Sequence, residues 1–259
     1  MATPPALRVM EAKARTYRRT WRASIISTFL NPVLYLTAMG LGLGTLVDQG
    51  TGDASLGGIP YLVFLAPGLL AATAMQTGTG DASYPVMAGM KWLKTYHAAL
   101  STPVRSRDLV FGHFAWVTVR IALTTVVFAA VMVIFDASTV GGAARAQLPA
   151  ILTGLAFATA VTAYTARLEN EYGLSSLFRF AIIPMFLFSG TFFPITQLPG
   201  WMQPVAYLTP LWHGVELTRA AALQTASAWQ PMLHGSYLML WVIVGAVFSV
   251  RNFRMRLTK

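Results

Sequence analysis

The side chains best suited to chemistry lie in the last third of the chain, where His213, Glu216 and Arg219 recur at every third position. This spacing places them on one face of a short helix, with Glu216 and Arg219 close enough to form a local ion pair. His213 and Glu216 supply only two potential metal ligands, fewer than the three that a catalytic zinc takes from protein. The plain interpretation is therefore a local ion pair of little energetic weight.

Other catalytic arrangements find little support. Ser189, followed by Gly190, and His234 can be imagined as a serine protease dyad, but Ser-Gly pairs are common where helices pack closely. The chain has no cysteine, which excludes disulfides, thiolate metal sites and cysteine nucleophiles. Neither glycine-rich stretch, Gly40–Gly44 or Gly50–Gly58, contains the lysine of a phosphate-binding loop. We expect no catalytic residue, cofactor or metal in this chain, and no ATP hydrolysis by that route.

The composition indicates the scaffold that must position these residues. Of the 259 residues, 55% are hydrophobic and 11% are charged, whereas a soluble domain carries about 25% charged residues. The apolar residues form blocks of about 20, the length that crosses a hydrocarbon core of ~30 Å as helix. Six such blocks are present: Ile25–Leu46, Pro60–Ala82, Leu109–Phe135, Leu148–Ala166, Leu174–Phe193 and Met232–Val250. We predict an all-α polytopic membrane protein with six transmembrane helices over residues 25–250.

Lysine and arginine placement predicts the orientation, because cytoplasmic loops are enriched in both. The segments 1–24, 83–108, 167–173 and 251–259 hold fifteen of them: Arg8, Lys13, Arg15, Arg18, Arg19, Arg22, Lys91, Lys94, Arg105, Arg107, Arg167, Arg251, Arg254, Arg256 and Lys259. The opposite segments, 47–59, 136–147 and 194–231, hold only Arg145 and Arg219. Both termini are thus expected in the cytoplasm, with a short basic tail at 251–259. Topology accounts for the net charge of +10 better than nucleic-acid binding does.

Residues 1–24 are predicted to form an amphipathic helix at the cytoplasmic membrane surface. Leu7, Met10, Ala14, Tyr17 and Trp21 fall on one helical face, and arginines occupy the other. Glu11 is spaced four residues from Arg15, which suits an ion pair. Such a helix either rests on lipid alone or also offers a docking surface to a cytoplasmic partner.

The cytoplasmic loop 83–108 has the pattern of a second short helix. Met90, Leu93, His97 and Leu100 recur at helical spacing, with Lys91, Trp92, Lys94 and Tyr96 among them, and Pro103 ends the pattern. The loop is either an interfacial connection or a docking helix for another chain. We favour docking, because 26 residues is long for a simple connection.

The outer segment 194–231 contains four prolines between Pro194 and Pro210. Proline removes backbone donors, so short re-entrant or interfacial helices are expected there in place of one long span. Trp201, Trp212 and Trp229 suit an aromatic belt at the membrane surface. In this setting His213, Glu216 and Arg219 have a second interpretation, as an outer gate that moves when a substrate leaves.

Arg120 lies within the third predicted span. A charge at mid-membrane costs about 2.5–3.5 kcal/mol, so it usually faces a cavity or the interior of the helix bundle. Its position also permits the alternative that its side chain extends to the cytoplasmic surface. Asp81, at the cytoplasmic end of the second span, is expected to be solvated.

Three stretches together resemble the permeases of type-2 ABC exporters, above all the nodulation-type lipo-oligosaccharide exporters and related antibiotic-resistance permeases. These are FLAPGLLAATAMQTGTGDASYPV (Phe64–Val86), KWLKTYHAALSTPVRSRDLVFG (Lys91–Gly112) and LFSGTFFPITQLPGWMQPVAYLTPLWHGVELTRA (Leu187–Ala220). The resemblance implies a bacterial inner-membrane permease with an N-terminal elbow helix, a coupling helix near Lys91–Leu100 and an outer gate near Pro194–Arg219.

The same resemblance implies partners. Two cytoplasmic ATPase subunits would hold ATP and Mg, and a second permease copy or a related permease would complete the pore. Amphipathic lipids, lipo-oligosaccharides or hydrophobic drugs would be the substrates, with membrane lipid around the bundle and no nucleic acid. The competing class is an ion-coupled transporter or channel that works without an ATPase. For that class the sequence offers Arg120 and acids at span ends, and no buried relay of acidic residues or histidines.

Overall fold

A computed structural model describes residues 4–48, 56 and 58–257. Its first half contains α1 (Pro5–Tyr35), η1 (Leu36–Leu43), α2 (Gly44–Asp48), α4 (Tyr61–Ala82), α5 (Tyr84–Met87), η2 (Ala88–Trp92), α6 (Thr95–Leu100) and α7 (Ser106–Ile134). Its second half contains α8 (Val140–Thr165), α9 (Tyr172–Leu177), η3 (Phe178–Ile182), α10 (Ile183–Phe188), η4 (Ile195–Gln197), α11 (Gln203–Tyr207), α12 (Pro210–Leu223) and α13 (Pro231–Leu257). All regular structure in the described residues is helical, as the hydropathy pattern predicts.

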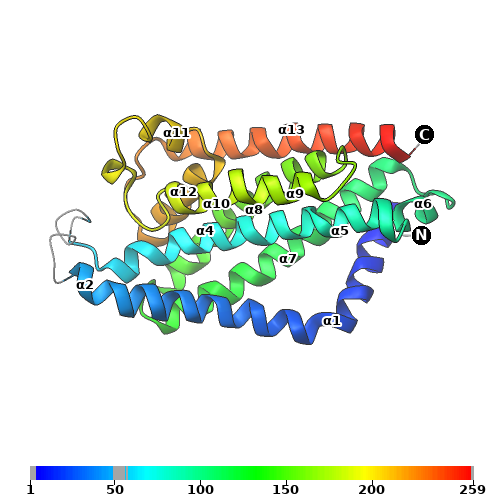
Figure 1. Ribbon diagram of the computed structural model, residues 1–259. Coiled ribbons are helices and arrows are strands. Elements are labelled where there is room, and N and C mark those ends of the chain that lie inside the picture. The colour runs from blue at the N-terminus through cyan, green and yellow to red at the C-terminus, as the bar shows by residue number, and fades with distance from the viewer. Residues whose placement is uncertain (1–3, 49–55, 57, 258–259) are drawn as a thin grey trace.

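The long helices run side by side in one bundle (Figure 1). The N-terminus, α6 and the C-terminal end of α13 lie together at one end, and α2 and α11 lie at the other. In the described residues four helical stretches are long and apolar enough to cross a membrane: Tyr61–Trp92, Ser106–Ile134, Val140–Thr165 and Pro231–Leu257. The chain is thus a multi-pass helical membrane protein, and its six-span count remains a prediction.

Two of the predicted spans differ from expectation. The elbow and the first span form one continuous helix, because α1 runs without interruption from Pro5 to Tyr35 and changes direction along its length (Figure 1). The fifth apolar helix covers only Tyr172–Phe188. It ends early because Ser189 leaves the helical conformation and Gly190 adopts a φ of 77°, which glycine tolerates best. Residues 251–257, predicted as a tail, continue α13.

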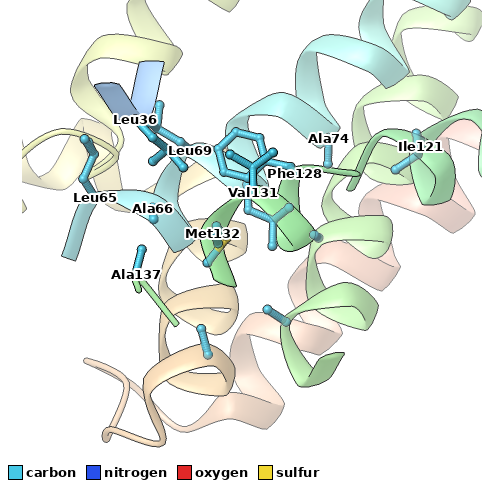
Figure 2. Close-up of a cluster of buried hydrophobic side chains, with 14 of the residues drawn as sticks. Leu36, Leu65, Ala66, Leu69, Ala74, Ile121, Phe128, Val131, Met132 and Ala137 are labelled. Carbon is cyan, nitrogen blue, oxygen red and sulfur yellow. The ribbon is translucent and has the colours of Figure 1, made fainter. Parts of the chain in front are cut away.

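The core forms where η1, α4 and α7 meet. Leu36 of η1 lies among Leu65 and Leu69 of α4 and Phe128 and Met132 of α7 (Figure 2). All five side chains are at most 1% exposed. This packing holds α4 at the centre of the bundle, in contact with α7, α8 and α12.

Small residues allow α4 and α8 to approach closely. A Cβ added to Gly154 of α8 would lie 2.8 Å from the Ala74 carbonyl oxygen of α4. Glycine at such a crossing lets two backbones touch, which is how helices gain packing energy in lipid. The tight α4–α8 pair therefore provides the rigid centre against which the functional elements are placed.

Candidate functional site

One cluster joins the elbow, the predicted coupling region and the last helix. It lies at the end of the bundle that is predicted to face the cytoplasm, and we call it the cytoplasmic-end cluster. Tyr96 of α6 is 5% exposed, and its ring centroid lies 5.4 Å from that of Phe253 on α13. Nζ of Lys13 on α1 donates to the Tyr96 hydroxyl at 3.4 Å. A Cβ added to Gly89 would lie 2.6 Å from the Tyr96 ring, so the ring rests directly on the η2 backbone. Tyr96 thus ties three separate parts of the chain together.

The predicted coupling helix Lys91–Leu100 is interrupted. η2 ends at Trp92 and α6 starts at Thr95, with Lys94 between them in the left-handed region at a φ of 51°. That conformation costs roughly 1–2 kcal/mol for a non-glycine residue. Burial of an aromatic ring contributes about 1.5–3 kcal/mol and offsets this cost. The helix is broken at Lys94, and beyond this break Tyr96 of α6 is buried in the bundle.

The predicted coupling residues differ in exposure. Trp92 is 55% exposed and Leu93 is 71% exposed, and Lys94 and His97 are also exposed. Lys91 is half-buried, and Tyr96 is buried. Trp92 and Leu93 therefore form an exposed apolar pair, whereas the Tyr96 side chain is buried against the rest of the bundle.

The elbow portion of α1 packs on α7. A Cβ added to Gly112 of α7 would lie 2.5 Å from the Ala6 carbonyl oxygen and 2.6 Å from Cβ of Val9. The Tyr17 and Trp116 rings meet edge to face, with centroids 5.5 Å apart. Nη2 of Arg15 lies 3.8 Å from Oε2 of Glu11, which confirms the predicted ion pair.

One part of the apolar face of the elbow helix packs on the bundle, and the other part is exposed. Val9 and Tyr17 contact the bundle, and Met10 is half-buried. Leu7 and Trp21, predicted on the same face as Tyr17, are 44% and 43% exposed. Exposed apolar side chains on a surface helix suit contact with lipid.

Arg120 of α7 pairs with Asp81 of α4 inside the bundle. Nε of Arg120 lies 3.3 Å from Oδ2 of Asp81, and the two side chains are 17% and 23% exposed. The guanidinium carbon lies 4.4 Å from the Tyr17 ring centroid, a cation–π distance. Asp81, expected to be solvated, is only 23% exposed and has Arg120 of α7 as its partner. Polar and apolar cavities adjoin this pair.

The outer cluster is centred on Arg219 of α12, which is 9% exposed. Its Nη1 donates to Glu216 Oε1 at 2.9 Å, its Nη2 to the Gly190 carbonyl at 2.8 Å and its Nε to the Phe64 carbonyl at 3.2 Å. The guanidinium carbon also lies 3.9 Å from the Phe64 ring centroid. The predicted ion pair between Glu216 and Arg219 is confirmed, and the buried Arg219 also bonds to two segments far from it in sequence.

His213 and His234 form a second outer contact, with their Nδ1 atoms 2.9 Å apart. Nε2 of His213 lies 3.1 Å from the Tyr207 carbonyl, which can only accept, so Nε2 carries the hydrogen. His234 therefore donates to Nδ1 of neutral His213. Burial and the neighbouring charge of His234 lower the pKa of His213 to about 4, against a smaller upward effect of the Tyr207 hydrogen bond.

The described residues that a protease dyad or a metal site would need are not brought together in this region. Ser189 Oγ shares a hydrogen bond with Thr209 Oγ1 at 2.8 Å, whereas His234 contacts His213, so the imagined protease dyad is absent from these contacts. Among the described residues, no group of three or more histidines, acids or cysteines gathers as a metal site would require. Trp212, expected at the membrane surface, is 2% exposed and packs between Tyr207 and Trp229.

Sequence comparison identifies the protein family of this chain. Residues 8–223 match the family model described as ABC-2 type transporter. The chain belongs to the ABC-2 type transporter family. It is 33% identical to Nodulation protein J of Sinorhizobium fredii, over 91% of this chain and 87% of that protein. It is 32% identical to Nodulation protein J of Rhizobium leguminosarum bv. viciae, over 100% and 99%, and 32% identical to that of Rhizobium meliloti, over 93% and 89%.

The family membership confirms the resemblance to type-2 ABC permeases that the three sequence stretches indicate. An ABC-2 transporter chain is a membrane-spanning, non-catalytic subunit that works with an ATPase subunit. The sequence pattern identifies Arg120, Arg219 and the local partner Glu216, but not the pairing of Arg120 with Asp81 or the bonds from Arg219 to the carbonyls of Phe64 and Gly190. Their separation along the chain left no local pattern that pairs them.

Proposed function

We propose that this chain is the permease subunit of an ATP-driven exporter that moves amphipathic molecules out across a bacterial inner membrane. Two copies of a cytoplasmic ATPase and a second permease copy complete the transporter. Lipids, lipo-oligosaccharides and hydrophobic drugs are the substrate classes that suit such a subunit, and the Nodulation protein J relatives favour a lipo-oligosaccharide.

One observation carries this proposal beyond family membership: the exposed pair Trp92 and Leu93 at the end of the bundle. The pair stands at the end of the helical stretch Tyr61–Trp92 and just before α6, which lies at the same end of the bundle as both termini (Figure 1). Two large apolar side chains at a bundle end suit a cleft of a partner protein, where a few aromatic anchors carry most of the binding energy. A partner that moves this pair moves the span attached to it.

The test is co-purification of the ATPase with the double variant Trp92→Ala, Leu93→Ala. Loss of a central anchor typically costs about 2 kcal/mol or more, so at least a tenfold loss of bound ATPase is expected, together with loss of export. Trp201→Ala is the matched control, because Trp201 is 75% exposed and lies outside the cytoplasmic-end cluster. Normal ATPase binding and export by the double variant would contradict the coupling role.

An ion-coupled transporter is the second candidate, and the Arg120–Asp81 pair inside the bundle is the observation that favours it. The two functions differ in energy source. An ATP-driven exporter stops on depletion of ATP while the ion gradient is held, whereas an ion-coupled transporter stops when an ionophore collapses the gradient. Export that persists without ATP would replace the first proposal with the second.

A further inference from the structure

We infer that the cleft around Arg120 and Asp81 is the cargo site, and that its ligand is an amphiphile with an uncharged head rich in hydroxyl and amide groups. This inference rests on the proposed export function and adds the place and the chemistry of the cargo. Its basis is that a polar cavity and an apolar cavity meet at a single ion pair.

The polar cavity has a volume of about 260 Å³ and lies between α1, α4 and α7. Besides the ion pair, its polar lining consists of Asn31, Thr73, Gln76, Thr77 and Thr124. On α4 the lining positions recur at intervals of three and four, so they share one face of a membrane-spanning helix. Polar side chains are costly against lipid and usually mark a ligand or solvent path.

The lining groups select for an uncharged head. The charges of Arg120 and Asp81 compensate each other at 3.3 Å, so an anionic head would have to displace Asp81. The hydroxyls of Thr77 and Thr124 donate to the carbonyls of Thr73 and Arg120 and keep lone pairs free to accept. The amides of Asn31 and Gln76 both donate and accept. Such a set matches the hydroxyl and amide groups of a sugar-like head.

The apolar cavity continues from the same ion pair. It has a volume of about 580 Å³, and both Asp81 and Arg120 line it as well as the polar cavity. Val9 and Ala12 of the elbow, Leu109 and Trp116 of α7 and Leu93 of the coupling region add apolar walls. Its polar lining beyond the ion pair includes Lys13, which donates to the Tyr96 hydroxyl, and Thr16 and Thr95. Volumes of this order hold small ligands, and apolar walls suit an alkyl chain. A head in the polar cavity therefore places its chain beneath the elbow helix.

A third cavity, of about 610 Å³, provides an entrance. Tyr17, Trp116 and Arg120 line both this cavity and, from the other side, the apolar one. Its outer walls include Trp21, Val119 and Leu123, which are 43–45% exposed. Exposed apolar side chains on a spanning helix face lipid, so an amphiphile can enter sideways from the bilayer. Arg120 lines all three cavities and stands at their junction.

The test uses the full chain in lipid nanodiscs without an ATPase and measures binding of dodecyl maltoside, an uncharged sugar head on one alkyl chain. Two comparison probes are used: dodecyl phosphate, which has an anionic head on the same chain, and maltose, which has the sugar head and no chain. The double variant Gln76→Leu, Thr124→Val should bind dodecyl maltoside roughly 5- to 150-fold more weakly, since each of the two lost hydrogen bonds costs about 0.5–1.5 kcal/mol. Thr118→Val is the matched control, because Thr118 bonds to Phe114 on the same helix but lines none of these cavities.

Tight binding of dodecyl maltoside that is lost in the double variant and kept in Thr118→Val supports the inference. Equal binding by the double variant and the control overturns it, as does preference for dodecyl phosphate. If the double variant instead loses self-association, the polar face is a protein interface and the inference fails. The binding test contains no ATPase, so its result is independent of the export test. Dodecyl maltoside can bind even if ATP-driven export is disproved, and export can be confirmed even if this cleft binds no amphiphile.

Discussion

Arg219 illustrates how one buried side chain can hold distant parts of a membrane protein together. It bonds to Glu216 three residues away and to the carbonyls of Gly190 and Phe64, which are far from it in sequence. A Cβ added to Gly68 would lie 2.9 Å from the Thr191 carbonyl and 3.1 Å from Nη2 of Arg219. The absence of a side chain at position 68 therefore leaves room for the guanidinium.

Arg219→Ala should lower the free energy of unfolding by about 1–3 kcal/mol, because the carbonyls of Gly190 and Phe64 lose their donor and the half-buried Glu216 keeps only the Ala228 N–H. Thermal unfolding of the purified chain, followed by tryptophan fluorescence, measures the effect. Arg145→Ala is the control, since Arg145 is exposed and makes a single bond to the Ala221 carbonyl. Equal loss of stability in the two variants would contradict the clamping role of Arg219.

His213 predicts a pH dependence of the outer cluster. Burial holds its pKa near 4, below the ordinary value of 6.5. Between these two values the unfolded chain binds a proton that the folded chain does not, so stability falls as the pH drops through this window. The charge of His234 contributes to the lowering of the His213 pKa. Glu216 lies in the same cluster and interacts with His234.

The measurement is the unfolding temperature between pH 7.5 and pH 4.5 for the wild type and for His213→Phe. Phenylalanine keeps a ring against Tyr237, whose centroid lies 4.1 Å from that of His213, but cannot take up a proton. The variant should lose less stability on acidification than the wild type. Parallel pH profiles would assign the acid sensitivity to other groups.

At the scale of elements, α6 is a connecting piece between the elbow and α13. Its single buried side chain, Tyr96, touches Gly89, Phe253 and Lys13, which belong to three different elements. In the proposed coupling, a movement of Trp92 and Leu93 by the ATPase would reach the elbow and the last helix through the Tyr96 ring. Docking and transmission are assigned to different residues of the same loop.

Tyr96→Ala should destabilise the chain by about 3–5 kcal/mol, as truncation of buried aromatic side chains does. Tyr96→Phe keeps the ring and loses only the Lys13 hydrogen bond, so its stability should stay within about 1.5 kcal/mol of the wild type. Chemical unfolding of both variants separates this packing role from direct contact with an ATPase. Wild-type stability of Tyr96→Ala, with weakened ATPase binding, would instead make Tyr96 a docking residue.

At the scale of the whole molecule, the elements expected in the cytoplasm share one end of the bundle. The N-terminus, α6 and the end of α13 lie together, opposite α2 and α11 (Figure 1). This arrangement suits a membrane protein with both termini on one side. The side itself is predicted from the fifteen basic residues of the inner segments.

Cysteine labelling tests that orientation cleanly, because the chain has no native cysteine. Thr225→Cys, in the exposed turn after α12, should react with an impermeant maleimide added to intact cells. Ser101→Cys, exposed directly after α6, should react only once the membrane is opened. Labelling of both positions in intact cells would contradict the predicted topology.

The sequence alone determines the class of this protein and much of its element order. Blocks of apolar residues predict the spanning helices, because every backbone polar group in lipid must be satisfied within its own helix. The prolines between Pro194 and Pro210 predict short broken helices, which the structure confirms as η4, α11 and the start of α12. These features depend on neighbours in sequence and can be read from local periodicity.

Tertiary structure decides which polar groups meet. Arg120 and Asp81 are 39 residues apart, and Arg219 and the Phe64 carbonyl are 155 apart, so no local spacing pairs them. The burial of Tyr96 likewise depends on Phe253, at the far end of the chain. A side chain's cost in the membrane is set by the groups that packing brings to it. The composition of the chain supplies these charges and rings, and the packing of α1, α4, α7 and α13 determines what they do.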